Sequence, residues 1–588
     1  MSYLNRETNY DRFPTTKIDG DYKSFEGYEN ILDFIVSKKA KITTVETYPG
    51  VNDEELLPKL KQALKPELVI NSIDMFYESE TLDKIMYPFL TDDRVRGRMC
   101  YGTILDFIDH NKLEEFKKQV EEFNGTILIY GFGASLINKG NLLILAELTR
   151  WEIQLRYRKG MPNYNATNYK EDSLKKIKRG YFVEWRIADK LKFNIFNDVD
   201  YYLDTTIENN PKLVEMKGLI KALNVLSNKP FRLVPYFDPG VWGGQWMKEV
   251  CNLDPKEKNY AWSFDGVPEE NSLRFDFNGV IVETPAMNLV KKEPINLLGK
   301  KVFARFGAEF PIRFDFLDTM EGQNLSLQVH PTTEFIKENY GMTYTQDESY
   351  YILDAKEDGG VFLGLKEDVD KDEFINALKQ AQKTNNFDHE KYVNRFPCKK
   401  HDHFLIPGGT IHCSSYNAMV LEISATPYIF TFKLWDWDRL GLDGLPRPIH
   451  IEEGEKVIDY SRRTNWVKEN LVDHFETIHD DKDYKEIKTG LHELEFIETH
   501  VYTSANKVEH NTNDTVNVFN LVDGKAAIIK SIDNKFEPYT VHYAETFIIP
   551  ASVGRYTIEP IGGEIKYLKA YVRNRWIRPV GDSPVIRY

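Results

Sequence analysis

The sequence predicts an α/β N-terminal domain followed by all-β domains of jelly-roll type, the first of which carries a helical insertion. Up to about residue 225, short β-branched runs such as KITTVETY alternate with longer helical runs such as DEELLPKLKQAL. From residue 226 onward, strand-like runs such as IRFDFLDT and AMVLEIS follow one another between turn residues. The first pattern is typical of a parallel sheet, and the second is typical of a β sandwich.

A chain of 588 residues is expected to contain about three or four domains, because it exceeds what a single hydrophobic core supports, and the pattern along the sequence divides it into three. The first boundary is predicted where Asn, Pro and Gly cluster in NKPFRLVPYFDPGVWGG. The helical pattern of KDEFINALKQAQ marks the insertion, and AAIIKSI, ETFIIPA and EIKYLKAYV predict a last set of strands. The predicted domains are 1–225, 226–493 with an insertion near 366–397, and 494–588.

The charge and the apolar pattern disfavour nucleic acid and membranes as partners. The chain has 91 acidic and 76 basic residues, a formal charge of -15, which repels a phosphate backbone. It has no apolar run long enough to span a membrane, and its first residues lack the features of a secretory signal. We therefore expect a cytoplasmic protein whose four cysteines are reduced thiols, so that a metal would need other ligands.

The N-terminal domain gives little indication of its chemistry. ILIYGFGASLI ends a predicted strand in a GxG pattern, but neither a third spaced glycine nor a Walker A motif is present. RVRGRMCYGTILDFID, ELTRWEIQLRYRKG and GYFVEWRIADKLK weakly resemble the P-loop domain related to uridine kinases, with its phosphate loop missing. Without that loop, the favoured interpretation is a structural or docking domain.

A candidate metal site begins in LSLQVH. Alternation along a strand places Ser326, Gln328 and His330 on one face. By itself this pattern is typical of ordinary hydrogen-bonded strand residues. Glu348 at the start of a strand and His412 after a Gly-Gly turn favour a metal site over ordinary strand residues. A Gln oxygen, two imidazoles and a carboxylate form a mixed N/O set with room for water, as a catalytic zinc requires.

Several strings occur in the order that type I phosphomannose isomerases show, and the chain resembles that family of zinc cupins from about 230 to 455. They are VWGGQWMKEV, FPIRFDFLD, LSLQVHP, DESYYILDA, IPGGTIHC and LWDWDRLGLDGLPRPIHIE. The resemblance implies cupin domains and one zinc ion per chain, held by Gln328, His330, Glu348 and His412. It also implies that Arg439 is the active-site arginine. Another divalent metal would also suit this ligand set.

The sequence departs from the family at two positions where lysine is usual. These positions hold Gln346 and Asp315. Glutamine cannot take a proton as lysine does, and aspartate reverses the charge. Asp315 is a candidate base if it is buried, since burial raises the pKa of a carboxylate.

Four further residues are candidates for binding the substrate: Ser326, Lys433, Arg447 and His450. A regular strand would place Lys433 on the same face as Arg439. The ordinary alternatives are a surface lysine for Lys433 and a structural histidine for His450.

The predicted function is that of a metal-dependent aldose–ketose isomerase that interconverts mannose 6-phosphate and fructose 6-phosphate. Its partner would be a small sugar phosphate. Two alternatives remain: an isomerase or epimerase of another sugar or sugar phosphate, and a sugar-binding cupin with weak catalysis. The oligomeric state is not predicted.

Overall fold

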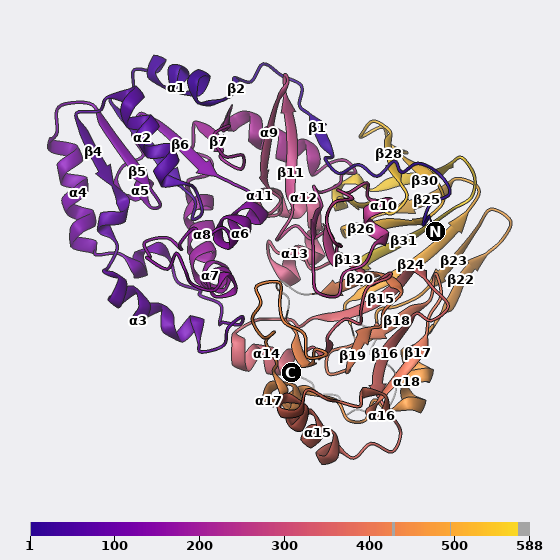
Figure 1. The fold of residues 1–588 in the computed structure, drawn as a ribbon. Helices are drawn as coiled ribbons and strands as arrows, with labels where there is room; N and C mark the ends of the chain where they lie inside the picture. The colour runs from indigo at the N-terminus through magenta and orange to yellow at the C-terminus, as the bar shows by residue number, and fades with distance from the viewer. Residues whose placement is uncertain (1, 426–427, 429, 494, 574–588) are drawn as a thin grey trace, which may run out of the picture.

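The computed structural model describes residues 2–425, 428, 430–493 and 495–573, and Figure 1 shows three parts along the chain. An α/β part occupies one side of the view. The other side holds a β sandwich formed by the middle of the chain and a second sandwich formed by its last strands.

The α/β part is built on a seven-stranded sheet of order β2-β8-β7-β6-β3-β5-β4. Strands β7 to β4 of this order run parallel, and β8 and β2 pair antiparallel at one edge. Strands β5 and β6, with sequences ILIYG and LLILAE, are wholly buried. Such continuous apolar runs are typical of parallel strands covered by helices on both faces.

The strands of this sheet are β2 (Ser24–Glu26), β3 (Ile42–Thr47), β4 (Leu68–Asn71), β5 (Ile127–Gly131), β6 (Leu142–Glu147), β7 (Tyr201–Asp204) and β8 (Lys212–Glu215). Its helices are α1 (Tyr28–Ser37), α2 (Asp53–Leu64), α3 (Ser79–Leu90), α4 (His110–Glu122), α5 (Ala134–Ile137), α6 (Arg150–Arg158), α7 (Ser173–Arg179), α8 (Trp185–Ile195) and α9 (Met216–Leu226).

The GxG pattern after β5 contacts a side chain of the same domain. The amides of Gly133 and Ser135 donate to the buried carboxylate of Glu46 over 2.6 and 2.8 Å. Burial raises the pKa of Glu46 to about 7, although these hydrogen bonds oppose the rise. The backbone donors that would approach a phosphate are therefore already used by a carboxylate.

The middle of the chain forms a sandwich of a six-stranded sheet, β18-β15-β20-β13-β10-β9, and a five-stranded sheet, β17-β16-β19-β14-β21. Side chains from both sheets share one apolar core. The first sheet contains β9 (Tyr236–Asp238), β10 (Trp262–Gly266), β13 (Arg313–Asp318), β15 (Asp347–Ala355), β18 (His403–Ile406) and β20 (Ala418–Ala425). The second contains β14 (Leu327–Val329), β16 (Gly360–Leu365), β17 (Val393–Pro397), β19 (His412–Ser414) and β21 (Phe432–Trp435).

Helices interrupt and border this sandwich. Two of them, α15 (Lys371–Thr384) and α16 (His389–Tyr392), lie within the range predicted for the insertion. The apolar face of α15 packs into the core of the sandwich. The others are α10 (Trp246–Val250), α11 (Met287–Lys292), α12 (Pro294–Leu298), α13 (Lys300–Phe306), α14 (Thr333–Tyr340), α17 (Ile451–Val457) and α18 (Thr464–Asn470).

The last strands form a second sandwich of sheets β22-β23-β24-β31-β26-β29 and β25-β30-β27-β28. Their bounds are β22 (Glu476–Asp480), β23 (Tyr484–Lys488), β24 (Ile497–Ser504), β25 (Val508–Asn511), β26 (Asn517–Asp523), β27 (Ala526–Ser531), β28 (Tyr539–His542), β29 (Thr546–Ile549), β30 (Arg555–Ile561) and β31 (Ile565–Val572). Because β23 pairs with β24, this sheet begins before residue 494, where the sequence pattern places the boundary.

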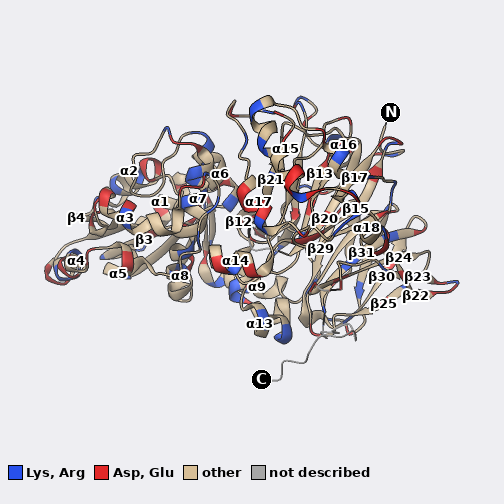
Figure 2. Ribbon diagram, turned by 90° about the horizontal axis from the view of Figure 1, so that it is seen from below, with Lys and Arg blue, Asp and Glu red and all other residues tan. Residues whose placement is uncertain are grey.

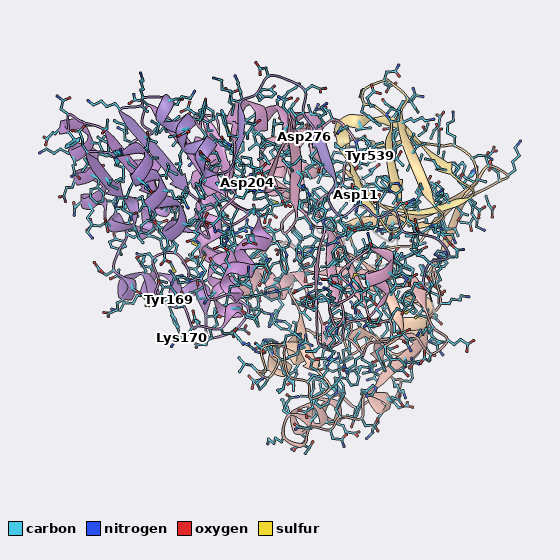
Figure 3. All side chains as sticks on the ribbon, turned by 45° about the horizontal axis from the view of Figure 1, so that its top comes forward. Asp11, Tyr169, Lys170, Asp204, Asp276 and Tyr539 are labelled. Atoms are coloured by element: carbon cyan, nitrogen blue, oxygen red, sulfur yellow. The ribbon has the colours of Figure 1, made fainter. Side chains whose placement is uncertain are left out.

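The first residues of the chain pack against the β domains. Strand β1 (Thr15–Lys17) runs beside β11 (Ser272–Phe277), which pairs with β12 (Val280–Pro285). The amide of Asp11 donates to Glu545 over 2.7 Å, and Figure 3 shows Asp11 near Tyr539 of β28. The N-terminal segment thus ties the last domain to the middle one, which a pattern based on local periodicity does not reveal.

Charged side chains of both signs are spread over all three parts of the ribbon (Figure 2). Among the described residues, every helix is too short or too polar to cross a membrane.

Candidate metal centre

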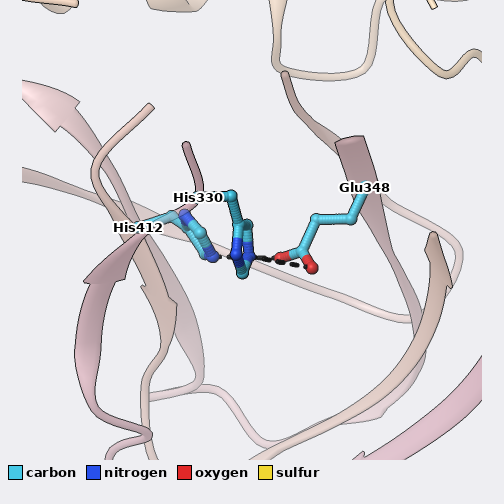
Figure 4. A group of neighbouring side chains, drawn as sticks. All are labelled: His330, Glu348 and His412. Atoms are coloured by element: carbon cyan, nitrogen blue, oxygen red, sulfur yellow. Dashed lines mark ion pairs between the residues drawn. The ribbon is translucent and has the colours of Figure 1, made fainter. Parts of the chain in front are cut away.

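Three strands of the middle sandwich bring two histidines and a glutamate together (Figure 4). His330 directly follows β14, Glu348 lies on β15 of the facing sheet, and His412 begins β19. The Nε2 atoms of His330 and His412 lie 3.1 and 2.9 Å from the two carboxylate oxygens of Glu348. All three side chains are almost fully buried.

Gln328 completes the set. It lies opposite His412 in the β14–β19 ladder, and its amide nitrogen is 3.2 Å from Nε2 of His412. The two ends of a glutamine amide exchange places by a half-turn, so that the same side chain can present its oxygen to a metal. The structure thus brings together all four predicted metal ligands.

The orientation of the two imidazoles fits a bound cation. Nδ1 of His330 lies 2.9 Å from the carbonyl oxygen of Phe430, and Nδ1 of His412 lies 2.9 Å from that of Thr410. Each Nδ1–H therefore donates to a carbonyl, which leaves the lone pair of each Nε2 directed at Glu348. Two lone pairs and a carboxylate repel one another unless a positive charge lies between them.

Protonation in this cluster also favours metal binding. Burial lowers the pKa of His412. Burial raises the pKa of Glu348, but positive charge on the neighbouring imidazoles of His330 and His412 outweighs burial and holds that pKa below its usual range, and a divalent cation between the three groups would act in the same direction. A neutral imidazole and an ionised carboxylate are the forms that bind a divalent ion, and this N/O set suits zinc and several other divalent metals.

A cavity of about 260 Å³ opens above this centre. Gln328 lines this cavity, and so do all four residues predicted to bind substrate: Ser326, Lys433, Arg447 and His450. The hydroxyl of Ser326 is buried and has no hydrogen-bond partner among the described residues. Burial, with the nearby charge of Arg447, lowers the pKa of Lys433 to about 7.

Two neighbouring carboxyl groups also line the cavity. Asp315 of β13 pairs directly with Glu422 of β20, and both line the cavity. Burial raises the pKa of Asp315 to about 7, and burial with the charge of Glu348 raises the pKa of Glu422 well above its usual value. The sequence analysis did not single out Glu422, although an acidic residue within the apolar run AMVLEIS was a usable signal.

The side-chain amide of Gln346 is engaged at both ends. Its nitrogen donates to Glu348 over 3.0 Å and to Glu422 over 3.4 Å, and its oxygen accepts from the amide of Phe430 over 2.8 Å. The side chain therefore positions the two glutamates and does not act as a base.

Replacing Gln346 with leucine is expected to lower the free energy of unfolding by about 1–3 kcal/mol, because the buried amide of Phe430 loses its acceptor. Chemical denaturation of the wild-type and variant chains measures this difference. Equal stability would show that this hydrogen bond contributes nothing to the fold.

Arg439 does not share a strand face with Lys433, so that expectation is wrong. Strand β21 ends at Trp435, and Trp437 and Asp438 adopt left-handed backbone angles with φ of 56° and 53°, so the chain turns before Arg439. Its guanidinium pairs with Asp436 and donates to the carbonyl of Asn324.

Arg447 also pairs with Asp436, over 2.9 Å, and it lines the cavity. Arg439 is not among the lining residues, although its charge reaches Lys433. Of the two arginines that pair with Asp436, only Arg447 is among the residues that line the cavity.

The α/β domain forms the remaining wall of the cavity. The rings of Trp151 and Tyr236 stack with centroids 3.9 Å apart and planes 7° from parallel. Nη1 and Nη2 of Arg158 each lie 2.9 Å from one carboxylate oxygen of Asp238. Arg96 contacts His450, with 2.5 Å between Nη1 and Nε2. No local sequence pattern indicates these contacts, because each joins residues far apart in the chain.

Comparisons with known proteins divide the chain in a similar way. Residues 27–228 match a family model described as a domain of unknown function, DUF8485. The probable mannose-6-phosphate isomerase GmuF of Bacillus subtilis (strain 168) is 24% identical over 337 residues, which is 56% of this chain and 96% of that protein. Mannose-6-phosphate isomerase ManA of the same organism is 23% identical over 236 residues, 40% of this chain and 69% of that protein.

Among solved structures, the mannose 6-phosphate isomerase from Bacillus subtilis covers 58% of this chain with all of its own length, at 19% identity and a TM-score of 0.48. The relatives confirm the resemblance to mannose-6-phosphate isomerases that the sequence motifs indicate. The resemblance of the N-terminal domain to a P-loop domain finds no support in them.

Proposed function

We propose that this protein is a metal-dependent aldose–ketose isomerase that interconverts mannose 6-phosphate and fructose 6-phosphate. One observation carries the proposal: a buried His330–Glu348–His412 centre and the Asp315–Glu422 carboxyl pair adjoin the same cavity. Relatives named as mannose-6-phosphate isomerases support this choice of reaction.

Isomerisation moves a proton between C2 and C1 of the sugar, and the carboxyl pair has the properties for this transfer. Asp315, with a pKa of about 7, is partly ionised near neutral pH and can take the proton from one carbon and return it to the other. Glu422, whose pKa burial raises well above its usual value, can in its protonated form donate to the C1 oxygen and recover a proton from the C2 hydroxyl. Neighbouring groups with separated pKa values are typical of acid–base pairs.

Gln328, His330, Glu348 and His412 would hold the metal. A divalent cation bound there supplies Lewis-acid stabilisation of the charge that develops on oxygen. On the wall beside it, Lys433 and Arg447 offer positive charge to the phosphate group.

The direct test is an assay of the purified full-length chain. Metal-loaded protein is expected to form fructose 6-phosphate from mannose 6-phosphate, detected by a coupled enzyme or by NMR. A chelator is expected to abolish turnover, and divalent metal is expected to restore it. Absence of the ketose with a full metal complement would contradict the proposal.

Asp315 favours one alternative, because it places a carboxyl group where relatives of the phosphomannose isomerase type commonly have lysine. A different aldose or aldose phosphate would then be the preferred substrate. A panel of both, assayed in parallel, separates this alternative from the main proposal. Sugar-dependent thermal stabilisation without any product would instead indicate a binding protein.

A further inference from the structure

One side of the cavity concentrates positive charge. Lys433 and Arg447 of the middle domain and Arg96 of the α/β domain all line it. The ammonium group of Lys433 has no hydrogen-bond or ion-pair partner among the described residues. Arg447 pairs with Asp436, and Asp436 also pairs with Arg439. The acidic side chains on this side therefore leave part of the positive charge unmatched.

Arg96 is held firmly at this site. It lies in the segment after α3, is 4% exposed, and its guanidinium packs over the rings of Phe430 and Phe432, 5.5 and 4.8 Å from their centroids. Its nearest carboxylate oxygen, on Asp93, is 3.7 Å away. The buried Nε–H has no hydrogen-bond partner among the described residues.

Burying a guanidinium with an unfilled donor costs free energy, and such a group is rarely retained without a role. Here the donor belongs to a side chain that borders the same cavity as an unpartnered lysine. A phosphate monoester, with nearly two negative charges and three acceptor oxygens, matches this arrangement.

We propose that Arg96 of the α/β domain joins Lys433 and Arg447 in binding the phosphate group of the substrate, so that this domain selects phosphorylated over unphosphorylated sugars. The inference rests on the proposed function in that it assigns an end of the same substrate cavity. It gives the domain matched by DUF8485 a role in substrate recognition beyond docking.

The test measures binding of inorganic phosphate to the full-length, metal-loaded chain by calorimetry, which requires no turnover. Arg96→Gln is expected to weaken phosphate binding by about tenfold to a hundredfold, as the loss of a charge-assisted hydrogen bond does. Arg96→Lys, which keeps the charge but loses the planar fork, is expected to fall between this variant and the wild type.

Arg94→Gln is the matched control. Arg94 lies two residues away, pairs with Asp172 of its own domain and with Asp443 of the middle domain, and does not line the cavity. This variant loosens the same interface without removing a cation from the site, and its phosphate affinity is expected to stay within about threefold of wild type, as for a surface ion pair.

Three results would overturn the inference: no phosphate binding by the wild-type chain, unchanged binding by Arg96→Gln, or equal weakening in Arg94→Gln. Kinetics separate it from the proposed function. If mannose 6-phosphate is turned over and Arg96→Gln leaves both its KM and phosphate binding unchanged, only this inference fails. If no isomerase activity exists but Arg96→Gln loses phosphate, only the proposed function fails.

Discussion

Replacing His330 with alanine is expected to remove the metal from the purified chain and to abolish isomerase activity. The variant lacks one imidazole of a four-ligand set whose donor atoms face one another in a buried site. Loss of a group that only supports a ligand commonly costs 10- to 100-fold in metal affinity, so loss of a ligand itself should cost at least about 100-fold. Elemental analysis after dialysis against a weak chelator measures the retained metal.

The control for this experiment is His403→Ala. His403 is equally buried in the same sandwich, and its ring nitrogens have no hydrogen-bond partner among the described residues. It lies opposite Tyr351, on the face of β15 turned away from Glu348. His403→Ala therefore leaves a similar cavity but should keep the metal. Equal metal content in wild type and His330→Ala would show that His330 is not a metal ligand and would contradict the proposed function.

The sequence was most informative about the metal centre. Strand alternation placed Gln328 and His330 together, and Glu348 and His412 lie at the starts of strands β15 and β19 in the two facing sheets. These features depend on a local period of two, which a sequence displays directly. The alternation of strands and helices in the N-terminal domain was predictable for the same reason.

The cavity above that centre could not be predicted, because long-range packing creates it. Arg96 reaches His450 across more than three hundred residues of sequence, and nothing local marks either residue as part of a shared wall. The turn that moves Arg439 off its strand depends on two left-handed residues, Trp437 and Asp438, neither of which is a glycine. Sequence patterns predict elements better than the contacts between domains.

Replacing Asp315 with asparagine is expected to lower kcat for aldose–ketose conversion by about 100- to 10,000-fold, the usual contribution of a positioned acid–base group. Asparagine keeps the size of the side chain but cannot accept the proton. Because burial raises the pKa of Asp315 to about 7, the active carboxylate form is present above that pH and is lost below it. Wild-type kcat/KM should therefore fall about tenfold per pH unit as the pH drops below 7. The residual activity of Asp315→Asn should not show this decrease at acidic pH.

Asp318→Asn provides a matched control on the same strand. Burial also raises the pKa of Asp318 to about 7, but its carboxylate accepts from the backbone amides of Met247 and Met320 over 2.8 and 3.0 Å and does not line the cavity. An asparagine there leaves one of the two amides without an acceptor, so the free energy of unfolding of the variant should fall by about 1–3 kcal/mol. Its folded fraction should keep the wild-type kcat and the decrease of kcat/KM below pH 7. If the decrease of kcat/KM below pH 7 is absent in Asp318→Asn and present in Asp315→Asn, Asp315 is not the base. The proton transfer would then have to be assigned to another group, and Glu422, the neighbouring carboxyl whose pKa burial raises well above its usual value, is the next candidate.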